Sequence, residues 1–297
     1  MKSVAASNAA APHRAADFVA LTKPRLNSLV VVSAGVGYVL GAGAAPDLAV
    51  ALHALIGCGL VAGSAAAFNQ VAERDVDKAM RRTERRPLAA GRITPAEGTV
   101  FAGVVGAAGL AELALGANVL AALVALVTLV CYAGIYTPLK RRTAWATLVG
   151  AVPGALPPVI GWAAARGALT VEAAVLFGIV FLWQLPHFHA LAWLYRDDYA
   201  RAGLPLVATR DPDGRRTAAH AAAYAAALVP MSLAPALVGL VGPGHLAVAG
   251  ALGALLLIPA LRFRRRRDDR RARALFVASL AYLPLLWISL VLGNARG

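Results

Sequence analysis

Residues 48–88 read LAVALHALIGCGLVAGSAAAFNQVAERDVDKAMRRTERRPL, a long apolar run that passes directly into a cluster of charged residues. The apolar part, from Leu48 into Gln70, exceeds the roughly 20 residues that a helix needs to cross the hydrocarbon core of a bilayer. A helix is the expected conformation, because backbone polar groups cannot face lipid unpaired. The stretch therefore predicts a membrane span that ends in a charged loop.

The composition of the whole chain agrees with this prediction. Of 297 residues, 59% are hydrophobic and 15% are charged, with a mean hydropathy of +0.66, whereas soluble domains carry about a quarter charged residues. Such a chain has too little polar surface to cover a soluble globule. Nine apolar stretches are long enough to span a bilayer: residues 26–45, 48–70, 98–116, 118–136, 145–165, 171–194, 217–240, 243–261 and 274–293.

The basic residues gather in every second connection between these stretches. Outside them, the only Lys and Arg residues are Arg166 and Arg296. Because basic loops stay on the cytoplasmic side of a membrane, we expect the N-terminus inside and the C-terminus on the opposite side. The segments that hold 27 of the 29 basic residues are the N-terminal arm and residues 71–97, 137–143, 195–216 and 262–273.

The net charge of +14 follows mostly from this topology, so we expect no nucleic-acid partner. The run Arg262–Arg267 is interpreted as a stop-transfer signal that contacts anionic lipid headgroups, with DNA or RNA binding as a remote alternative. Cys58 and Cys131 fall inside apolar stretches, far apart in sequence, which indicates neither a metal site nor a disulfide.

The expected fold is an all-α, polytopic membrane bundle of about nine helices. Residues 1–25 are expected to form a cytoplasmic arm, and residues 26–297 a single transmembrane domain. The first 17 residues lack the apolar centre of a secretory signal. They are rich in Ala and poor in acids, which leaves a remnant of a mitochondrial presequence open beside a plain cytoplasmic tail.

The charged loop after the second span carries oxygen ligands at regular spacing. Asn69, Glu73 and Asp77 lie four residues apart, so an uninterrupted helix would align them in one stripe about 12 Å long. Mg²⁺ prefers such hard oxygen ligands and keeps substrate phosphates among them. From spacing alone, a metal–diphosphate site and a solvated, salt-bridged surface helix are equally good interpretations.

Arginines continue this loop. Arg81 extends the stripe by four residues, and Arg82 and Arg86 add forked donors that suit phosphate oxygens. Pro87 is expected to end any helix at Arg86. Asn69 lies at the membrane end of an apolar helix, where an unpartnered polar side chain is costly, and this favours the site over the surface helix.

The string NQVAERDVDKAMRRTERRPL, residues 69–88, resembles the first Asp-rich motif of the UbiA superfamily of intramembrane prenyltransferases, and most of all its heme O synthase branch. The resemblance implies a nine-helix bundle around a cavity open to lipid and to the cytoplasmic face. It also implies that Asn69, Glu73 and Asp77 coordinate Mg²⁺. The residues implied to hold the diphosphate are Arg81, Arg82 and Arg86.

A second basic loop is YTPLKRRT at residues 136–143. From its residue types alone, it is equally well interpreted as a substrate-binding site or as a turn that is basic because it lies on the cytoplasmic side. It is similar to a block of heme O synthases, as is GALPPVIGW at residues 154–162, and this implies that Lys140 and Arg141 contact diphosphate. Ala146 departs from the Asn often found in the family, which puts one local polar contact in doubt.

The third block, WQLPHFHALAWLYRDDY, covers residues 183–199. By chemistry alone, His187 and His189, beside Trp183 and Trp193, could face a flat aromatic macrocycle, although a lone membrane His is more often hydrogen-bonded within the bundle. The block resembles heme O synthases, whereas quinone-type relatives carry an acid at Phe188. This implies His187 as a porphyrin contact, and it leaves Asp197 and Asp198 as acids beside the site, suited to a second Mg²⁺. His189 departs from the Trp usual in the family.

The implied activity is transfer of a farnesyl group from farnesyl diphosphate to the vinyl group of heme B, giving heme O, with Mg²⁺ as cofactor. Two rivals remain: a prenyltransferase for a quinone precursor or other aromatic ring, and a heme or lipid transporter without enzymatic activity. The expected location is a bacterial inner membrane, with a downstream heme-modifying enzyme or terminal oxidase as a partner. Glu112, deep inside a span, is a candidate for a functional role as an intramembrane carboxylate and equally for helix packing, and it is left outside the site.

Overall fold

Residues 11–294 are described by the computed structural model of this chain, and within them the chain is helical, with an isolated bridge between Val241 and Asn294 and no β-strand. Nine segments of this range are long and apolar enough to cross a membrane, which confirms the predicted all-α bundle. The chain is a multi-pass membrane protein. The spans are α2 (Pro24–Ala42), α3 (Leu48–Ala72), α5 (Pro95–Gly116), α6 to α7 (Val119–Leu139), α8 to α9 (Ala146–Arg166), α10 (Val171–Leu194), α12 (Arg215–Leu237), α13 (His245–Arg265) and α14 (Asp269–Leu292).

Two of the spans change their helical form part-way. The fourth runs from α6 (Val119–Leu129) through a π-helical segment, η1 (Val130–Tyr136), into the short α7 (Thr137–Leu139). The fifth breaks at Leu156 between α8 (Ala146–Ala155) and α9 (Pro157–Arg166), where a Pro begins the second helix. Proline lacks the N–H that would continue the hydrogen-bond ladder, so it begins a helix more easily than it continues one.

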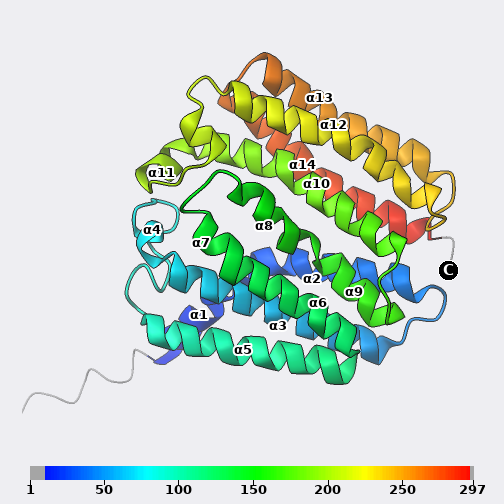
Figure 1. The fold of residues 1–297 in the computed structure, drawn as a ribbon, viewed down its shortest axis with the longest axis horizontal. Coiled ribbons are helices and arrows are strands. Elements are labelled where there is room, and N and C mark those ends of the chain that lie inside the picture. Colours follow the sequence, from blue (N-terminus) through cyan, green and yellow to red (C-terminus); the bar gives the residue numbers. More distant parts are fainter. Residues whose placement is uncertain (1–10, 295–297) are drawn as a thin grey trace, which may run out of the picture.

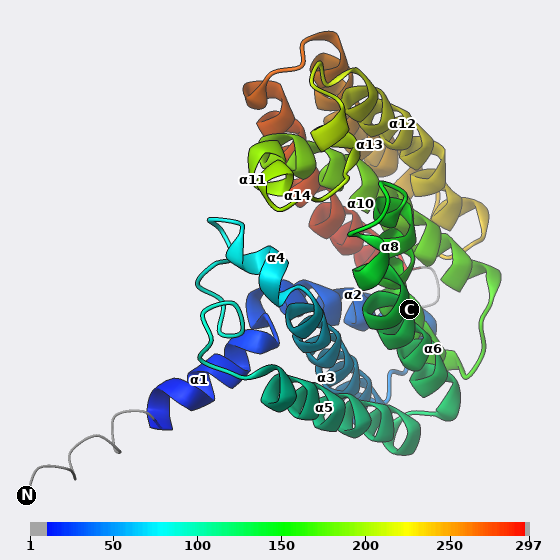
Figure 2. The same cartoon turned by 60° about the vertical axis from the view of Figure 1, so that its left-hand side comes forward.

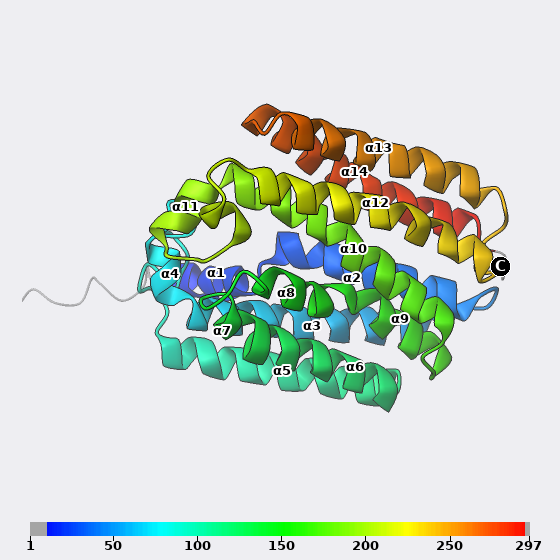
Figure 3. The same ribbon diagram turned by 45° about the horizontal axis from the view of Figure 1, so that its top comes forward.

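Four short elements lie outside the spans. They are α1 (Ala11–Leu21), α4 (Arg74–Lys78), α11 (Arg196–Arg201) and the 3₁₀ segment η2 (Val207–Arg210). Figure 1 shows α4 and α11 at one end of the bundle and the end of α14 at the other. This arrangement follows from an odd number of spans, and it places the charged loops after α3 and α10 at the same end (Figure 3).

The helices pack in two groups, seen on the two sides of the bundle in Figure 2 and joined by contacts of α10 with α8 and α9 and of α14 with α2. In one group, α3 packs on α5 and α2 packs on α9; in the other, α10, α12, α13 and α14 pack on one another. Small residues allow the closest approaches. A Cβ atom added to Gly161 would overlap the carbonyl oxygen of Ala34, and one added to Gly37 would overlap that of Pro158. Such close backbone contacts are typical of helices in lipid.

Large apolar side chains remain exposed on the outer faces of the spans. Leu115, Leu237 and Val100 are each more than 60% exposed, which is expected of a surface covered by lipid rather than by water. Arg264 to Arg267, in contrast, are exposed at the end of α13, beyond the apolar part of the helix.

Candidate active site

The charged loop after α3 is not one continuous helix. The helix α3 ends at Ala72, Glu73 leaves helical geometry with φ −96° and ψ 10°, and α4 covers only Arg74–Lys78. The expected straight stripe from Asn69 to Arg81 is therefore wrong, as is the expectation that the helix continues to Arg86. The break changes the direction of the chain after Glu73, so the residues that follow do not continue the face of α3. Arg81 is exposed.

The three predicted metal ligands are nevertheless all buried. Asn69, Glu73 and Asp77 are 3%, 2% and 1% exposed, although they lie at the end of the bundle that holds the charged loops. Burial of charged groups is costly unless each one has a partner. The residues around them supply those partners.

Each of the three side chains meets a cation. Asp77 accepts hydrogen bonds at both carboxylate oxygens from Arg86 Nη1, each at 2.9 Å. Glu73 accepts one from Lys140 Nζ at 3.1 Å. The Asn69 amide accepts from Lys23 Nζ at 3.1 Å through its oxygen.

Lys23 is the member of this cluster that the sequence reasoning missed. Among residues 11–294 it is the one non-glycine residue with a positive φ, 48°, just before Pro24 begins α2. Such backbone strain concentrates at functional sites. Burial, reinforced by the positive charge of Arg86, lowers the pKa of Lys23 to about 7. The available sequence signal was the Lys-Pro pair at the start of an apolar span.

The second loop contributes one of its two predicted residues to the cluster. The side chain of Lys140 is 16% exposed and faces Glu73. Although burial disfavours its charge, the neighbouring Tyr136 and Glu73 raise the pKa of Lys140 above its ordinary value, so it stays a cation. Arg141 is exposed instead, within electrostatic reach of the exposed Asp75.

The π-helical segment before this loop positions Thr137. The Asn69 Nδ2 donates to Thr137 Oγ1 at 3.3 Å, and Thr137 Oγ1 donates to the Tyr132 carbonyl at 2.8 Å. The amide of Asn69 is thus fixed from both sides, by Lys23 and by Thr137. Single π-helical turns inside α-helices are frequent at functional sites.

The third loop reaches the first through Tyr199. Its hydroxyl accepts a hydrogen bond from Arg82 Nη2 at 3.3 Å, and the Arg82 guanidinium lies over the ring of Tyr195 at 4.9 Å. Below them, an apolar cluster of Val76, Met80, Tyr199, Leu204 and Leu206 joins α4 to α11. The structure therefore brings all three charged loops together at one end of the bundle.

The two acids of the third loop lie differently. Asp198 is largely buried and forms an ion pair with Arg201 in the next turn of α11. Asp197 is exposed. Neither has a contact with the cluster around Glu73 and Asp77 among the interactions of the described residues.

His187 lies against α14, on α10. Its Nδ1 is 2.9 Å from Ser279 Oγ, and its ring stacks on Phe276 and Trp183, with centroids 4.8 and 5.4 Å apart. The ring is half-buried. It is thus held by neighbours, as a histidine that packs within the bundle would be, and it also adjoins the wall of a cavity.

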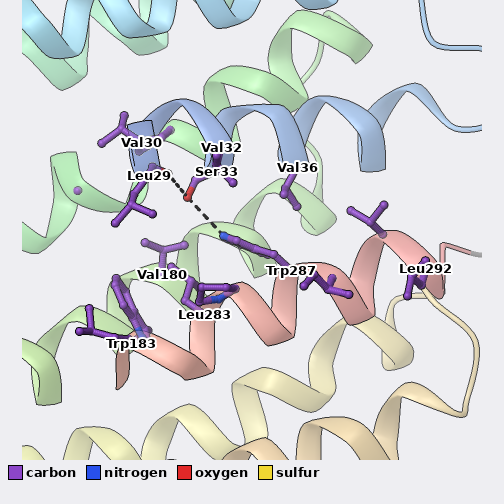
Figure 4. A pocket seen from close by; sticks show the side chains of 16 residues that line it. Leu29, Val30, Val32, Ser33, Val36, Val180, Trp183, Leu283, Trp287 and Leu292 are labelled. Atoms are coloured by element: carbon purple, nitrogen blue, oxygen red, sulfur yellow. Dashed lines mark hydrogen bonds between the residues drawn. The ribbon is translucent and has the colours of Figure 1, made fainter. Parts of the chain in front are cut away.

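That cavity has a volume of about 560 Å³ and lies between α2, α10 and α14. Figure 4 shows its apolar lining, with Trp183 and Trp287 as the large aromatic walls and Trp287 Nε1 bonded to Ser33 Oγ at 3.3 Å. Leu29, Val32 and Ile288 line it and are each more than half exposed, so the cavity opens sideways toward lipid. The helix α2 runs from Lys23 at the charged cluster along this cavity, which connects the two.

The cluster can accommodate a divalent metal ion. Across residues 11–294 no three His, Cys, Asp or Glu side chains form a metal site by themselves, so an ion here would need ligands from a substrate. Glu73 Oε1 is buried and accepts no hydrogen bond among the described residues, although Lys140 Nζ lies 3.1 Å from it as an ion pair. Two carboxylates and an amide, completed by phosphate oxygens and water, match the preference of Mg²⁺.

Glu112 lies outside the site, as expected. Its carboxylate is 2.8 Å from His53 Nδ1, and this pair joins α5 to α3. His53 lies near the start of α3 and Glu112 near the end of α5, so both are at the end of the bundle away from Glu73. The pair accounts for a carboxylate inside an apolar helix without a catalytic role.

The sequence matches the UbiA prenyltransferase family over residues 29–288. The fold agrees: the structure described as that of digeranylgeranylglyceryl phosphate synthase superposes with a TM-score of 0.80 at 14% identity, covering 95% of this chain and 98% of that one. A UbiA homolog from Archaeoglobus fulgidus bound to DMAPP and Mg²⁺ superposes with a TM-score of 0.68 at 17% identity, covering 93% of this chain and 99% of that one. The chain belongs to the UbiA prenyltransferase family.

Within that family, its curated relatives include protoheme IX farnesyltransferases. The one from Solibacter usitatus (strain Ellin6076) is 46% identical over 280 residues, which cover 91% of this chain and 96% of the relative. The one from Koribacter versatilis (strain Ellin345) is 43% identical and covers 93% of this chain and 92% of the relative. The resemblance to the heme O synthase branch that the three motifs indicated is confirmed.

Proposed function

We propose that this protein transfers the farnesyl group of farnesyl diphosphate to the vinyl group of heme B, giving heme O. The observation that carries the proposal is a charged cluster assembled from three loops at the end of α2, the helix that lines an apolar cavity from Leu29 onward. Relatives that are more than 40% identical over nearly the whole chain are named for the same substrates. A structural relative binds a prenyl diphosphate together with Mg²⁺, which supports Mg²⁺ as the cofactor.

The charged cluster is the proposed diphosphate site. Asn69, Glu73 and Asp77 would hold Mg²⁺, which supplies positive charge to the departing diphosphate. Arg86 pairs with Asp77 and Lys140 pairs with Glu73 in this structure. With substrate bound, each of these cations would also donate hydrogen bonds to phosphate oxygens. Further groups proposed to contact the diphosphate are Lys23, Arg81, Arg82 and Arg141, with Asp197 and Asp198 as acids at its edge.

The buried charges of the cluster favour an anionic ligand. The ammonium of Lys23 lies within electrostatic reach of two other cations and of two carboxylates, so the group carries an excess of positive charge when Lys23 is protonated. Preorganised charges of this kind contribute most where negative charge develops in the transition state. Here that charge develops on the leaving diphosphate.

The proposed chemistry is electrophilic. The allylic C–O bond of farnesyl diphosphate breaks, and its electron pair leaves with the diphosphate. The vinyl group of heme B then donates its π electrons to the farnesyl carbon. Water adds to the cation left on the heme side chain and loses a proton, so that heme B, farnesyl diphosphate and water give heme O and diphosphate. The apolar cavity would shield the farnesyl cation from early capture by water.

The proposed heme contact is His187. It adjoins the aromatic side of the cavity through Trp183, which lines the cavity and stacks on the His187 ring. Phe188 follows, where quinone-type relatives carry an acid, and this favours heme over a quinone precursor as the acceptor.

The choice of acceptor is tested with purified protein in lipid nanodiscs. With farnesyl diphosphate and Mg²⁺, we expect heme B to be converted to heme O, detected by the mass increase of a farnesyl group plus a hydroxyl group. A para-hydroxybenzoate-type ring offered in its place should stay unchanged. Prenylation of the ring, or heme binding without any product, would instead support the quinone-type enzyme or the transporter.

We propose that the protein lies in a bacterial inner membrane with α4 and α11 on the cytoplasmic side. The basic residues of the loops at this end support this orientation. Heme O would then be produced within the membrane that holds any downstream heme-modifying enzyme or terminal oxidase.

A further inference from the structure

A second pocket lies at the same end of the bundle but on another face. Its volume is about 350 Å³, and it shares no lining residue with the cavity between α2 and α14. It lies between the start of α8, η2 and α12, with His189 of α10 among its walls. The residues that line it are Ala144, Trp145, Thr147, Leu148, His189, Val207, Arg210, Arg216, His220 and Tyr224.

His189 lines this pocket, and its Nε2 forms no hydrogen bond with another residue of the described range 11–294. Its side chain is buried, 5% exposed, and its Nδ1 lies 2.8 Å from the carbonyl oxygen of Leu185. A carbonyl can only accept, so Nδ1 carries the proton and Nε2 of the neutral ring keeps its lone pair. A histidine whose Nδ1 is bonded to a backbone carbonyl in this way is the usual arrangement of a metal-binding imidazole.

Besides small and aliphatic residues, the rest of the pocket carries cationic and aromatic side chains. Arg210 and Arg216 line it and are exposed, so they form its outer part. The rings of His220 and Tyr224 lie 5.4 and 5.9 Å from that of His189. The nearby acid Asp211 already accepts hydrogen bonds from the backbone and side chain of Thr217, at 2.8 and 2.9 Å.

This distribution of charge selects among ligands. A simple anion such as a lipid phosphate would suit the arginines, but it cannot use a buried nitrogen that accepts rather than donates. A free metal cation would suit that nitrogen, but two arginines disfavour it. A flat ligand with a metal at its centre and carboxylates at its edge satisfies both, and heme has this chemistry, with two propionates for two arginines.

We propose that this pocket binds heme outside the transfer cavity, with His189 Nε2 as an axial ligand of the iron and Arg210 and Arg216 on the propionates. This heme pocket depends on the proposed function in one respect, namely that heme is the substrate of the protein. His187 and His189 face different partners, α14 and α12, so heme in this pocket is distinct from heme undergoing transfer. The site would hold heme at the protein before it reaches the cavity.

The test is a Soret-band titration of the full-length protein in nanodiscs. For ferric heme we expect His189→Leu to weaken binding at this site by about tenfold or more and to remove the spectrum of an imidazole-ligated iron. Metal-free protoporphyrin IX has no iron to coordinate, so its binding should be the same in the variant and the wild type. This comparison separates loss of an iron ligand from a damaged pocket.

The arginines are tested with a matched pair. Arg216→Gln should weaken heme binding by about tenfold, whereas Arg215→Gln, the preceding residue, which does not line the pocket, should not. Heme dimethyl ester, which lacks the propionate charges, should bind equally to Arg216→Gln and wild type. Heme titrations that are unchanged in both His189→Leu and Arg216→Gln would overturn the proposal.

The steady-state assay distinguishes this proposal from the proposed function. If the pocket only supplies heme, His189→Leu should raise the KM for heme and leave kcat at saturating heme close to wild type. No heme O from the wild-type protein would contradict the proposed function but not the pocket. A lowered kcat with an unchanged KM for heme and an unchanged titration would contradict the pocket alone.

Discussion

At the scale of single residues, the site depends on which charges the fold buries. Lys140 and Arg141 are neighbours in a basic loop, and nothing in their sequence distinguishes them. The structure turns Lys140 toward Glu73 and leaves Arg141 exposed. Residue types and spacing therefore predicted Asn69, Glu73 and Asp77 as oxygen ligands of one site with arginines nearby, but their burial and their individual partners depend on tertiary packing between loops.

The Glu73–Lys140 pair gives a prediction about stability. Lys140→Met leaves a buried carboxylate without its cation, which should lower the free energy of unfolding by about 3 kcal/mol. Thermal unfolding in detergent measures this change.

Lys78→Met is the matched control for Lys140→Met. Lys78 pairs with Asp75 at 3.7 Å, with both side chains more than half exposed, and such a pair contributes less than about 1 kcal/mol. Equal unfolding temperatures for the two variants would show that the Glu73–Lys140 pair is not buried as described.

At the scale of helices, hydropathy located all nine spans, but it could not locate the breaks within them. The interruption at Glu73, the π-helical turns of Val130–Tyr136 and the junction at Leu156 lie inside or beside apolar sequence. Hydropathy measures how favourably a segment moves from water into lipid. It says little about where the backbone hydrogen bonds of a helix change from the α pattern to another pattern. The first two of these breaks precede Asp77 and Thr137, whose side chains lie in the charged cluster.

The contact of α2 with α9 gives a prediction at this scale. Gly161→Ala adds a methyl group against the carbonyl of Ala34, and overpacking of this kind costs about 1–3 kcal/mol. Gly103→Ala, on the exposed face of α5 with open space around it, should leave stability unchanged or slightly higher. If both variants unfold at the wild-type temperature, α2 and α9 do not pack this closely.

At the scale of the whole molecule, the odd number of spans puts the two ends of the described chain on opposite faces (Figure 1). The fold itself sets no absolute direction. The direction across the membrane was predicted from the distribution of Lys and Arg among the loops. The shape of the bundle alone does not give it.

Cysteine labelling tests the orientation. In a chain with Cys58→Ala and Cys131→Ala, single cysteines are placed at Glu84, in the loop after α4, and at Ala168, between α9 and α10; both positions are exposed. In right-side-out membrane vesicles, an impermeant maleimide should label Ala168→Cys and spare Glu84→Cys. The reverse pattern would contradict the proposed orientation.

The claim on which the whole account depends is that the loop after α3 holds a metal-bound diphosphate. Calorimetric titration of farnesyl diphosphate, with and without Mg²⁺, tests it in Asp77→Asn, with Asp75→Asn as the exposed control two residues away. The account predicts that wild type and Asp75→Asn bind tightly only with Mg²⁺, and that Asp77→Asn loses about tenfold or more in affinity together with the response to Mg²⁺. Mg²⁺-dependent binding that is as tight in Asp77→Asn as in wild type would contradict it.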